Sequence, residues 1–184
     1  MNLIEILNSG LIQECGEVYG TDKEKNHGYI SNFYEKEFYL FKDKEIKLLE
    51  IGIYTGDSLK LWRKYFTKGE ITGVDITLNN VNDLSDDINY LVANAYEDDF
   101  SKTLSNFDII IDDGPHTFET QYKFIELYYP KLNEGGIMVI EDIHHSEEIT
   151  QKLIEKVIDL GAEYEFIDFK RLYNSKIISI KKNK

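Results

Sequence analysis

Cysteine is almost absent from this chain of 184 residues. The lone Cys15 cannot form an internal disulfide, and one cysteine provides no zinc framework. We therefore expect a fold that needs neither an oxidising compartment nor a structural zinc ion, with Cys15 as a packing residue.

Long apolar runs and basic residues are also scarce. No apolar run approaches the ~20 residues that span a bilayer, and no basic-then-apolar leader opens the sequence. The 21 Lys and Arg against 34 Asp and Glu give a net charge of -13, which repels phosphate backbones. We expect a cytoplasmic protein that binds neither membrane nor nucleic acid.

The apolar content is sufficient for one core. With 42% hydrophobic residues, 184 residues fit a single domain. Leu3, Ile4 and Leu7 recur at helical spacing, as do Leu11 and Ile12, and an aromatic run follows at 33–41. We expect one domain over 1–184, with an N-terminal helical cap at 1–45 and an α/β core at 46–184.

From residue 46 short apolar runs alternate with longer amphipathic stretches. This alternation predicts a Rossmann-like, doubly wound α/β fold with parallel strands. The segments at 164–169 and 176–180 are separated by a loop too short for a parallel crossover, so they should pair antiparallel. The sequence thus predicts a mostly parallel seven-stranded sheet with an antiparallel last strand. The expected strands are 46–51, 70–74, 90–93, 107–111, 137–140, 164–169 and 176–180, and the expected helices 58–66, 118–129 and 147–160.

The loop after the first of these strands has the pattern of a nucleotide site. Glu50 ends the strand, and Gly52 and Gly56 follow at a spacing that lets a ligand approach the backbone. Asp57 and Ser58 are good N-cap residues for the next helix, whose free N–H groups could face a cofactor carboxylate. A tight turn without any ligand is the alternative.

Asp75 ends the second strand, where a carboxylate can accept both hydroxyls of a ribose. The loop lacks the G-x-G-x-x-G of dinucleotide sites, and Tyr54 would crowd a pyrophosphate. S-adenosylmethionine has no phosphate, so this loop suits it better. Asn94 and Asp112 follow the next two strands at the same edge. Asn94 could bond adenine or satisfy its own turn.

Two acidic motifs meet at this edge. Asp112 and Asp113 with His116 follow the fourth strand, and Glu141 with Asp142 follows the fifth. So many like charges repel unless a cation neutralises them, and carboxylate oxygens suit Mg²⁺ or a similar ion. A turn at 112–115 and a helix cap at 141–142 are the alternatives without a metal.

Several motifs between residues 19 and 142 occur together: 19–23 with His27 and Tyr29, 48–52, 59–62, 73–76, 107–116 and 135–142. In this combination they resemble the metal-dependent sugar O-methyltransferases of the mycinamicin and rhamnosyl-tailoring type, and the cephalosporin-hydroxylase-type proteins. The resemblance implies a class I methyltransferase that uses S-adenosylmethionine and Mg²⁺. The acceptor would be a hydroxyl of a sugar or glycosylated small molecule.

The resemblance also implies roles for individual residues. Asp113, Glu141 and Asp142 would hold Mg²⁺, and His116 would take the proton of the acceptor hydroxyl. Glu50, Gly52, Tyr54, Gly56, Asp57, Ser58, Asp75, Asn94 and Asp112 are the expected cofactor residues.

The chain departs from this family at several points. Pro115 stands where the family usually has serine, Asn94 stands where it often has aspartate, and the longer family extensions are not in this sequence. Three alternatives stay open: a metal-independent methyltransferase acting on another small molecule or a protein, an NAD-linked oxidoreductase, and a non-catalytic module that binds S-adenosylmethionine. A homo-oligomer that completes the substrate pocket also fits the sequence.

Overall fold

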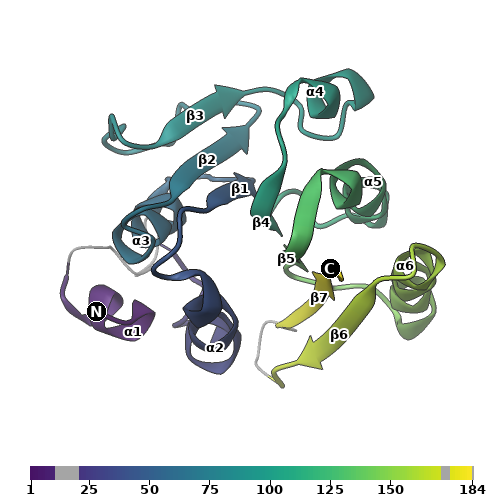
Figure 1. Ribbon diagram of the computed structural model, residues 1–184. Coiled ribbons are helices and arrows are strands. Elements are labelled where there is room, and N and C mark those ends of the chain that lie inside the picture. Colours follow the sequence, from purple (N-terminus) through teal and green to yellow (C-terminus); the bar gives the residue numbers. More distant parts are fainter. Residues whose placement is uncertain (11–20, 171–174, 184) are drawn as a thin grey trace.

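The computed structural model describes residues 1–10, 21–170 and 175–183. The protein is built around one central sheet (Figure 1). The strand order is β3-β2-β1-β4-β5-β7-β6. The strands are β1 Lys47–Ile51, β2 Glu70–Asp75, β3 Asn89–Val92, β4 Phe107–Asp112, β5 Leu132–Ile140, β6 Glu163–Asp168 and β7 Lys176–Lys181. The first five strands run parallel, and β7 is antiparallel to both β5 and β6. The predicted sheet is therefore confirmed.

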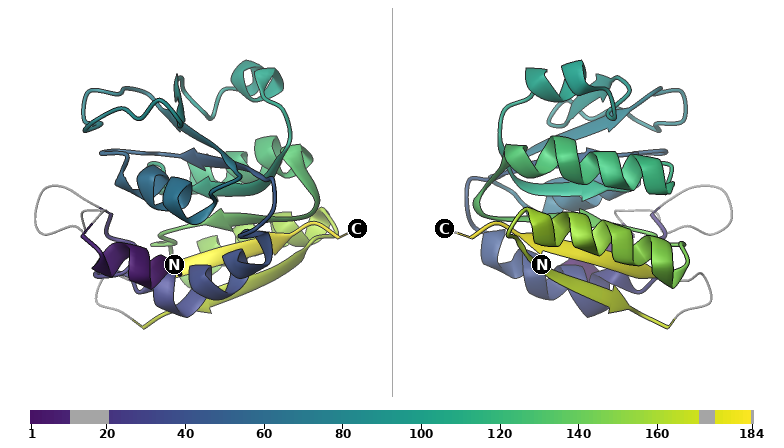
Figure 2. Two further views of the ribbon diagram at one scale, coloured as in Figure 1. Left: turned by 60° about the vertical axis from the view of Figure 1, so that its left-hand side comes forward. Right: turned by 90° about the vertical axis from the view of Figure 1, so that its right-hand side faces the viewer.

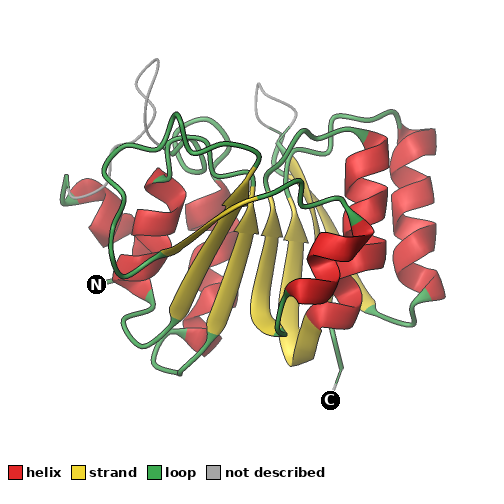
Figure 3. Ribbon diagram, turned by 90° about the horizontal axis from the view of Figure 1, so that it is seen from above, coloured by secondary structure: helices red, strands yellow, loops and turns green. Residues whose placement is uncertain are grey.

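Helices cover both faces of the sheet (Figure 3). The α-helices are α1 Leu3–Asn8, α2 Glu35–Phe38, α3 Asp57–Tyr65, α4 Asp98–Thr103, α5 Phe118–Tyr128 and α6 Glu147–Asp159. A π-helix, η1 Ile30–Tyr34, and two 3-10 helices, η2 Tyr39–Phe41 and η3 Tyr129–Lys131, complete the set for the described residues. Figure 2 shows α5 and α6 side by side on one face, with α1 and α2 on the other.

The strands divide their side chains between two cores because successive residues of a strand point to opposite faces. Leu48 and Ile109 pack with the N-terminal helices and α3, whereas Leu49 and Ile110 pack with α5 and α6. The centre of the sheet is therefore apolar on both faces, which explains the continuous apolar runs in the sequence.

Three of the α-helices, α1, α5 and α6, begin where a side chain accepts from a free N–H group. Asn2 and Glu5 form a capping box at α1, Thr117 accepts from the Thr120 N–H at α5, and Ser146 accepts from the Ile149 N–H at α6. The predicted amphipathic N-terminal helix is thus present over α1. Leu11, Ile12 and Cys15 lie outside the described residues, as do Tyr19 and Gly20 of the first motif.

Two elements differ from the sequence prediction. β5 begins at Leu132, five residues before the expected start, because its pairing with β4 shifts register between Phe107 and Ile109, and Gly135 lies there with a positive φ of 74°. The short α4 was not predicted. Its sequence, DDFSKT, consists mostly of weak helix formers, so the local pattern does not predict a helix. In the folded protein α4 packs against α5.

The functional consequence of this topology is geometric. The carboxyl ends of the parallel strands β1, β2, β4 and β5 meet at one edge, where the loops lie in Figure 3. The order reverses between β1 and β4, which is where ligands bind in open α/β sheets.

Candidate active site

The loops after β1 and β4 touch at this reversal point. Gly52 has a φ of 80°, and a Cβ added there would lie 2.1 Å from the backbone oxygen of Asp113. Only glycine satisfies both constraints. The predicted nucleotide loop is therefore packed directly against the first acidic motif.

A cleft of about 590 Å³ opens beside this contact. Gly52, Tyr54, Asp75 and Asn94 of the predicted cofactor residues line it, together with Asp113 of the acidic motif. The remaining lining residues are Ile51, Val74, Ile76, Thr77, Asn80, Ala93, Ala95, Tyr96, Gly114, Pro115 and Thr120. Its volume is in the range of small-molecule and cofactor sites.

Asp75 organises one wall of the cleft. Its Oδ2 accepts hydrogen bonds from the backbone N–H groups of Ile53 at 3.0 Å and Tyr54 at 3.3 Å. Tyr54 has a φ of 41°, which is uncommon for a residue with a side chain, and 59% of its surface is exposed. Asp75 thus fixes the strained loop and presents Tyr54 at the mouth of the cleft.

Glu50 does not line the cleft. It is fully buried, and its Oε2 accepts from Ser58 Oγ and Trp62 Nε1, each at 2.9 Å. Its Oε1 lies 3.3 Å from Lys23 Nζ. Burial raises the pKa of the Glu50 carboxyl, and Lys23 opposes that rise. Glu50 therefore ties the start of α3 to the interior below the cleft.

The N-cap of α3 was predicted wrongly. The helix begins at Asp57, with Gly56 as its N-cap at a φ of 79°. Asp57 accepts from Thr55 Oγ1 at 2.7 Å, and Ser58 donates to Glu50, so neither side chain caps the helix. Gly56 takes the position because its backbone conformation is left-handed.

Asn94 and Asp112 have partners within the protein. Asn94 accepts from the Tyr96 N–H at 3.1 Å and donates to Glu97 at 3.0 Å, so it satisfies its own turn. Asp112 is buried and accepts from the Tyr96 hydroxyl at 2.6 Å. Burial raises the pKa of Asp112 to about 7, although the bond from Tyr96 lowers it. Asp112 thus holds Tyr96 against the cleft instead of lining it.

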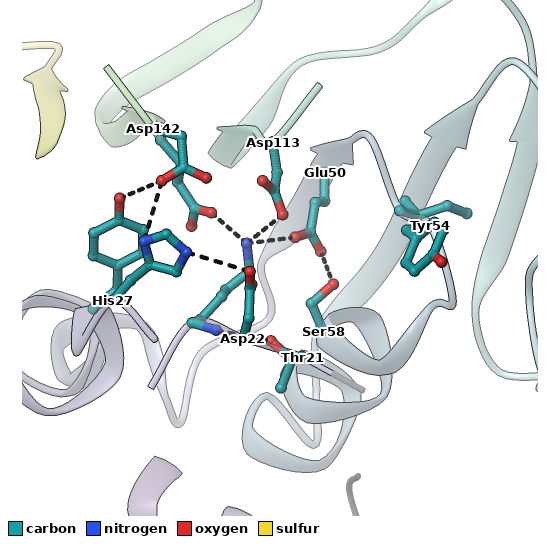
Figure 4. A network of polar contacts seen from close by, with 12 residues as sticks. Thr21, Asp22, His27, Glu50, Tyr54, Ser58, Asp113 and Asp142 are labelled. Carbon is teal, nitrogen blue, oxygen red and sulfur yellow. Dashed lines mark hydrogen bonds and ion pairs between the residues drawn. The ribbon is translucent and has the colours of Figure 1, made fainter. Parts of the chain in front are cut away.

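A buried lysine lies among the acidic side chains. Figure 4 shows two of its partners, Glu50 and Asp113, side by side, with Asp142 near them. Lys23 is 1% exposed, and its Nζ lies 2.7 Å from Asp113 Oδ2, 2.5 Å from Glu141 Oε2 and 3.3 Å from Glu50 Oε1. Burial alone would lower the Lys23 pKa, but the three carboxylates outweigh it and hold that pKa well above its usual value. One ammonium group therefore joins the nucleotide loop to both acidic motifs.

Glu141 is enclosed on both oxygens. Oε2 accepts from Lys23, and Oε1 accepts a short hydrogen bond from the Tyr34 hydroxyl. The side chain is 1% exposed, and burial raises the Glu141 pKa well above its usual value. To bind a cation, Glu141 would have to exchange one of these contacts.

Within the described residues, Asp142 has its hydrogen-bond partner on one oxygen. Its Oδ1 accepts from the Tyr29 hydroxyl at 2.6 Å and lies 3.3 Å from His27 Nδ1. Burial, followed by the charge of Asp142, raises the Tyr29 pKa far above its usual value, so this hydroxyl keeps its proton and donates. The other oxygen, Oδ2, lies 3.8 Å from His116 Nε2.

Asp113, His116 and Asp142 converge on one point. Each of these residues offers one ligand atom, and the three atoms lie within 4.8 Å of one another. The distances from His116 to the two carboxylates, 3.9 and 3.8 Å, are longer than hydrogen bonds. His116 and Asp142 also have positive φ angles, 57° and 54°, and such strain is concentrated at functional sites. We call Asp113, His116, Glu141 and Asp142 the acidic site.

Sequence reasoning missed the partners of the acidic site. Lys23, His27, Tyr29 and Tyr34 come from one segment, 21–34, more than 75 residues before Asp113. The sequence contained one signal: the stretch at 19–23 with His27 and Tyr29 belonged to the family resemblance. A role for it could not be derived because its contacts with the acidic site join residues that are distant in the chain.

Comparison with known proteins agrees with this architecture. A family model described as a methyltransferase domain matches residues 49–143. Two relatives are the 8-demethyl-8-alpha-L-rhamnosyl tetracenomycin-C 2'-O-methyltransferase of Streptomyces olivaceus, 31% identical over 70% of this chain, and the mycinamicin VI 2''-O-methyltransferase of Micromonospora griseorubida, 27% identical over 72%. The chain spans 36% of the length of each.

Solved structures show the same fold. The MycE methyltransferase of the mycinamycin biosynthetic pathway, in complex with Mg and SAH, superimposes with a TM-score of 0.69 at 23% identity over 86% of this chain and 50% of that one. Within the described residues no helix is long and apolar enough to cross a membrane. The family match covers more than half of the chain, from β1 to the end of the second acidic motif, and the chain belongs to the methyltransferase domain family.

Proposed function

We propose that this chain is an S-adenosylmethionine-dependent O-methyltransferase that uses Mg²⁺ or a similar divalent cation and acts on a hydroxyl of a sugar or glycosylated small molecule. One observation carries the proposal. Asp113 belongs both to the lining of the cleft and to the group of ligand atoms that converge with His116 and Asp142. A methyl donor in the cleft and an acceptor oxygen at the acidic site would therefore be neighbours.

The cleft fits the proposed methyl donor. Asp75 would accept from the ribose hydroxyls, and Gly52, which lines the same cleft, would let the cofactor chain approach the backbone. Tyr54 and Asn94 would border the base and sugar. The other predicted cofactor residues do not line the cleft and would shape its loop and walls; they are Glu50, Gly56, Asp57, Ser58 and Asp112.

The acidic site fits a divalent cation. Asp113 and Asp142 each keep one carboxylate oxygen directed toward the common point with His116, and oxygen ligands suit Mg²⁺. A bound cation would lower the pKa of the acceptor hydroxyl. Glu141 is the third proposed ligand, and it would bind the cation only after losing its contact with Lys23 or with Tyr34.

His116 is the proposed general base. Its Nε2 faces the space between the two carboxylates, and its side chain is 28% exposed, so both acceptor and solvent can reach it. Because the same nitrogen could instead bind a cation, the role of base requires its own test.

Thermal-shift titration with S-adenosylmethionine, with and without Mg²⁺, tests cofactor and cation together. We expect stabilisation by S-adenosylmethionine and none by NAD. A panel of glycosides then tests the acceptor, with EDTA as the control for the cation. Absence of any S-adenosylmethionine shift would refute the proposed activity.

A second candidate, a metal-independent methyltransferase, is favoured by Lys23. Its ammonium already compensates part of the charge on Asp113 and Glu141, so the site can exist without a metal. Methyl transfer that survives EDTA would support this alternative.

The remaining assignments follow from charge and from the relatives. The net charge of -13 disfavours nucleic acid, and the relatives are named for methylation of sugar-bearing small molecules, so we propose an acceptor of that class. A cytoplasmic location, the division into a cap at 1–45 and a core at 46–184, and a homo-oligomer stay predictions.

A further inference from the structure

We propose that Tyr29 is a positioning residue for the cation site, acting through Asp142, and that Lys23 has the corresponding role for Asp113. The inference rests on the proposed function in its use of a divalent cation. The new element is that the segment 21–34 sets the orientation of the carboxylates that would bind the cation.

The contacts divide the oxygens of each carboxylate between two tasks. Lys23 holds Asp113 Oδ2 at 2.7 Å, and the other oxygen, Oδ1, faces His116. Tyr29 holds Asp142 Oδ1 at 2.6 Å, and Oδ2 faces His116. In both aspartates, the oxygen nearest His116 is therefore the one that the segment 21–34 does not bond.

Glu141 follows a different pattern. Lys23 bonds one oxygen and Tyr34 bonds the other. The same segment therefore occupies both oxygens of Glu141 and does not leave one available to a cation. Tyr34 and Tyr29 are thus a matched pair: both are buried tyrosines that donate to an acidic side chain, but only the partner of Tyr29 keeps an oxygen facing His116.

Tyr29 is itself held in place. Its ring stacks on His27 at 4.9 Å between centroids and meets Phe169 edge-on at 5.0 Å. Figure 4 shows His27 beside Asp142, with a dashed contact between them. A hydrogen bond from such a fixed group determines the direction of a carboxylate, and outer partners of metal ligands typically change metal affinity by about 10–100-fold when removed.

The test measures Mn²⁺ affinity of the full chain by electron paramagnetic resonance, with Mn²⁺ as the probe for a hard divalent cation. Tyr29→Phe keeps the ring and removes one hydroxyl, and we expect Mn²⁺ to bind about 10–100-fold more weakly. Tyr34→Phe is the contrasting variant: it removes a hydroxyl from Glu141 and not from Asp142, so we expect no loss of Mn²⁺ affinity. S-adenosylmethionine affinity and melting temperature are measured on each variant to show that the fold and the cleft persist.

Unchanged Mn²⁺ affinity in Tyr29→Phe would overturn the inference. An equal loss in both variants would also overturn it, because the effect would not be specific to Asp142. If Tyr29→Phe does not fold, His27→Gln probes the same Asp142 oxygen and should also weaken Mn²⁺ binding; unchanged affinity there would count against the inference. A wild-type chain that binds S-adenosylmethionine but no Mn²⁺ would overturn both this inference and the proposed cation, while leaving the methyl-donor site intact.

Discussion

The cleft and the acidic site lie next to each other at one edge of the sheet but differ in how they are built. The cleft is formed largely by residues at or just after the carboxyl ends of β1, β2 and β3, such as Gly52, Asp75 and Asn94. The acidic site is completed by Lys23 and Tyr29, which reach it from the N-terminal segment. A site built from strand ends needs only local sequence, whereas a site built across the chain depends on tertiary packing.

The two regions also differ in the burial of their charged groups. Tyr54 at the mouth of the cleft is largely exposed, and Asp75 there bonds backbone N–H groups. In the acidic site Glu141 and Lys23 are both nearly inaccessible to water and compensate each other. Removing a charge should therefore affect stability in the acidic site and ligand affinity in the cleft.

The largest effect should follow from Lys23→Met, which leaves buried carboxylates without their cation. Breaking a buried ion pair from one side typically costs about 3–5 kcal/mol of unfolding free energy. Urea unfolding at pH 7 measures the loss. It should shrink near pH 4, where protonation relieves the uncompensated charge. Lys102→Met, at an exposed pair with Asp99, should change stability little. Equal losses in the two variants would contradict the comparison.

Replacement of His116 by alanine should lower kcat by about 10²–10⁴-fold, the usual contribution of a general base. Initial rates of methyl transfer to a glycoside acceptor that carries free hydroxyls provide the measurement. If His116 is the base, Mn²⁺ affinity should persist in the variant. Loss of Mn²⁺ binding together with activity would instead make His116 a cation ligand.

Asp75→Ala should weaken S-adenosylmethionine binding by about 10–100-fold, because hydrogen bonds to a charged group contribute about 1.5–3 kcal/mol. The loop at Ile53 and Tyr54 would also lose its acceptor. Isothermal titration calorimetry measures the change, with the exposed Asp99→Ala as control. Unchanged affinity would show that the cleft does not hold the ribose through Asp75.

Asp112 should produce the smallest effect, a pH dependence of stability. Burial raises its folded pKa to about 7, above the value of an unfolded aspartate, so the folded chain retains a proton that the unfolded chain has lost. The stabilising contribution is present below about pH 4 and is lost as pH rises to about 7. The melting temperature of Asp112→Asn should therefore fall less between pH 5 and 8 than that of the wild type. Parallel curves would assign the pH dependence to other groups.

The comparison also explains which features sequence reasoning could reach. Strand ends such as Glu50 and Asp112 were located within a residue or two, because apolar runs mark buried strands and parallel strands share an edge. The N-cap of α3 was misassigned because Gly56 adopts a left-handed conformation that no side-chain pattern reveals.

The sequence by itself determined that the chain is an α/β protein with a glycine loop and two acidic motifs at one sheet edge, since periodicity and motif order are local properties. The tertiary structure alone decided what each acidic side chain does there. It placed Lys23 among three carboxylates and occupied both oxygens of Glu141. It also left one oxygen of Asp113 and one of Asp142 facing His116. Such pairings join residues far apart in the chain, and burial gives them their strength, so no local pattern encodes them.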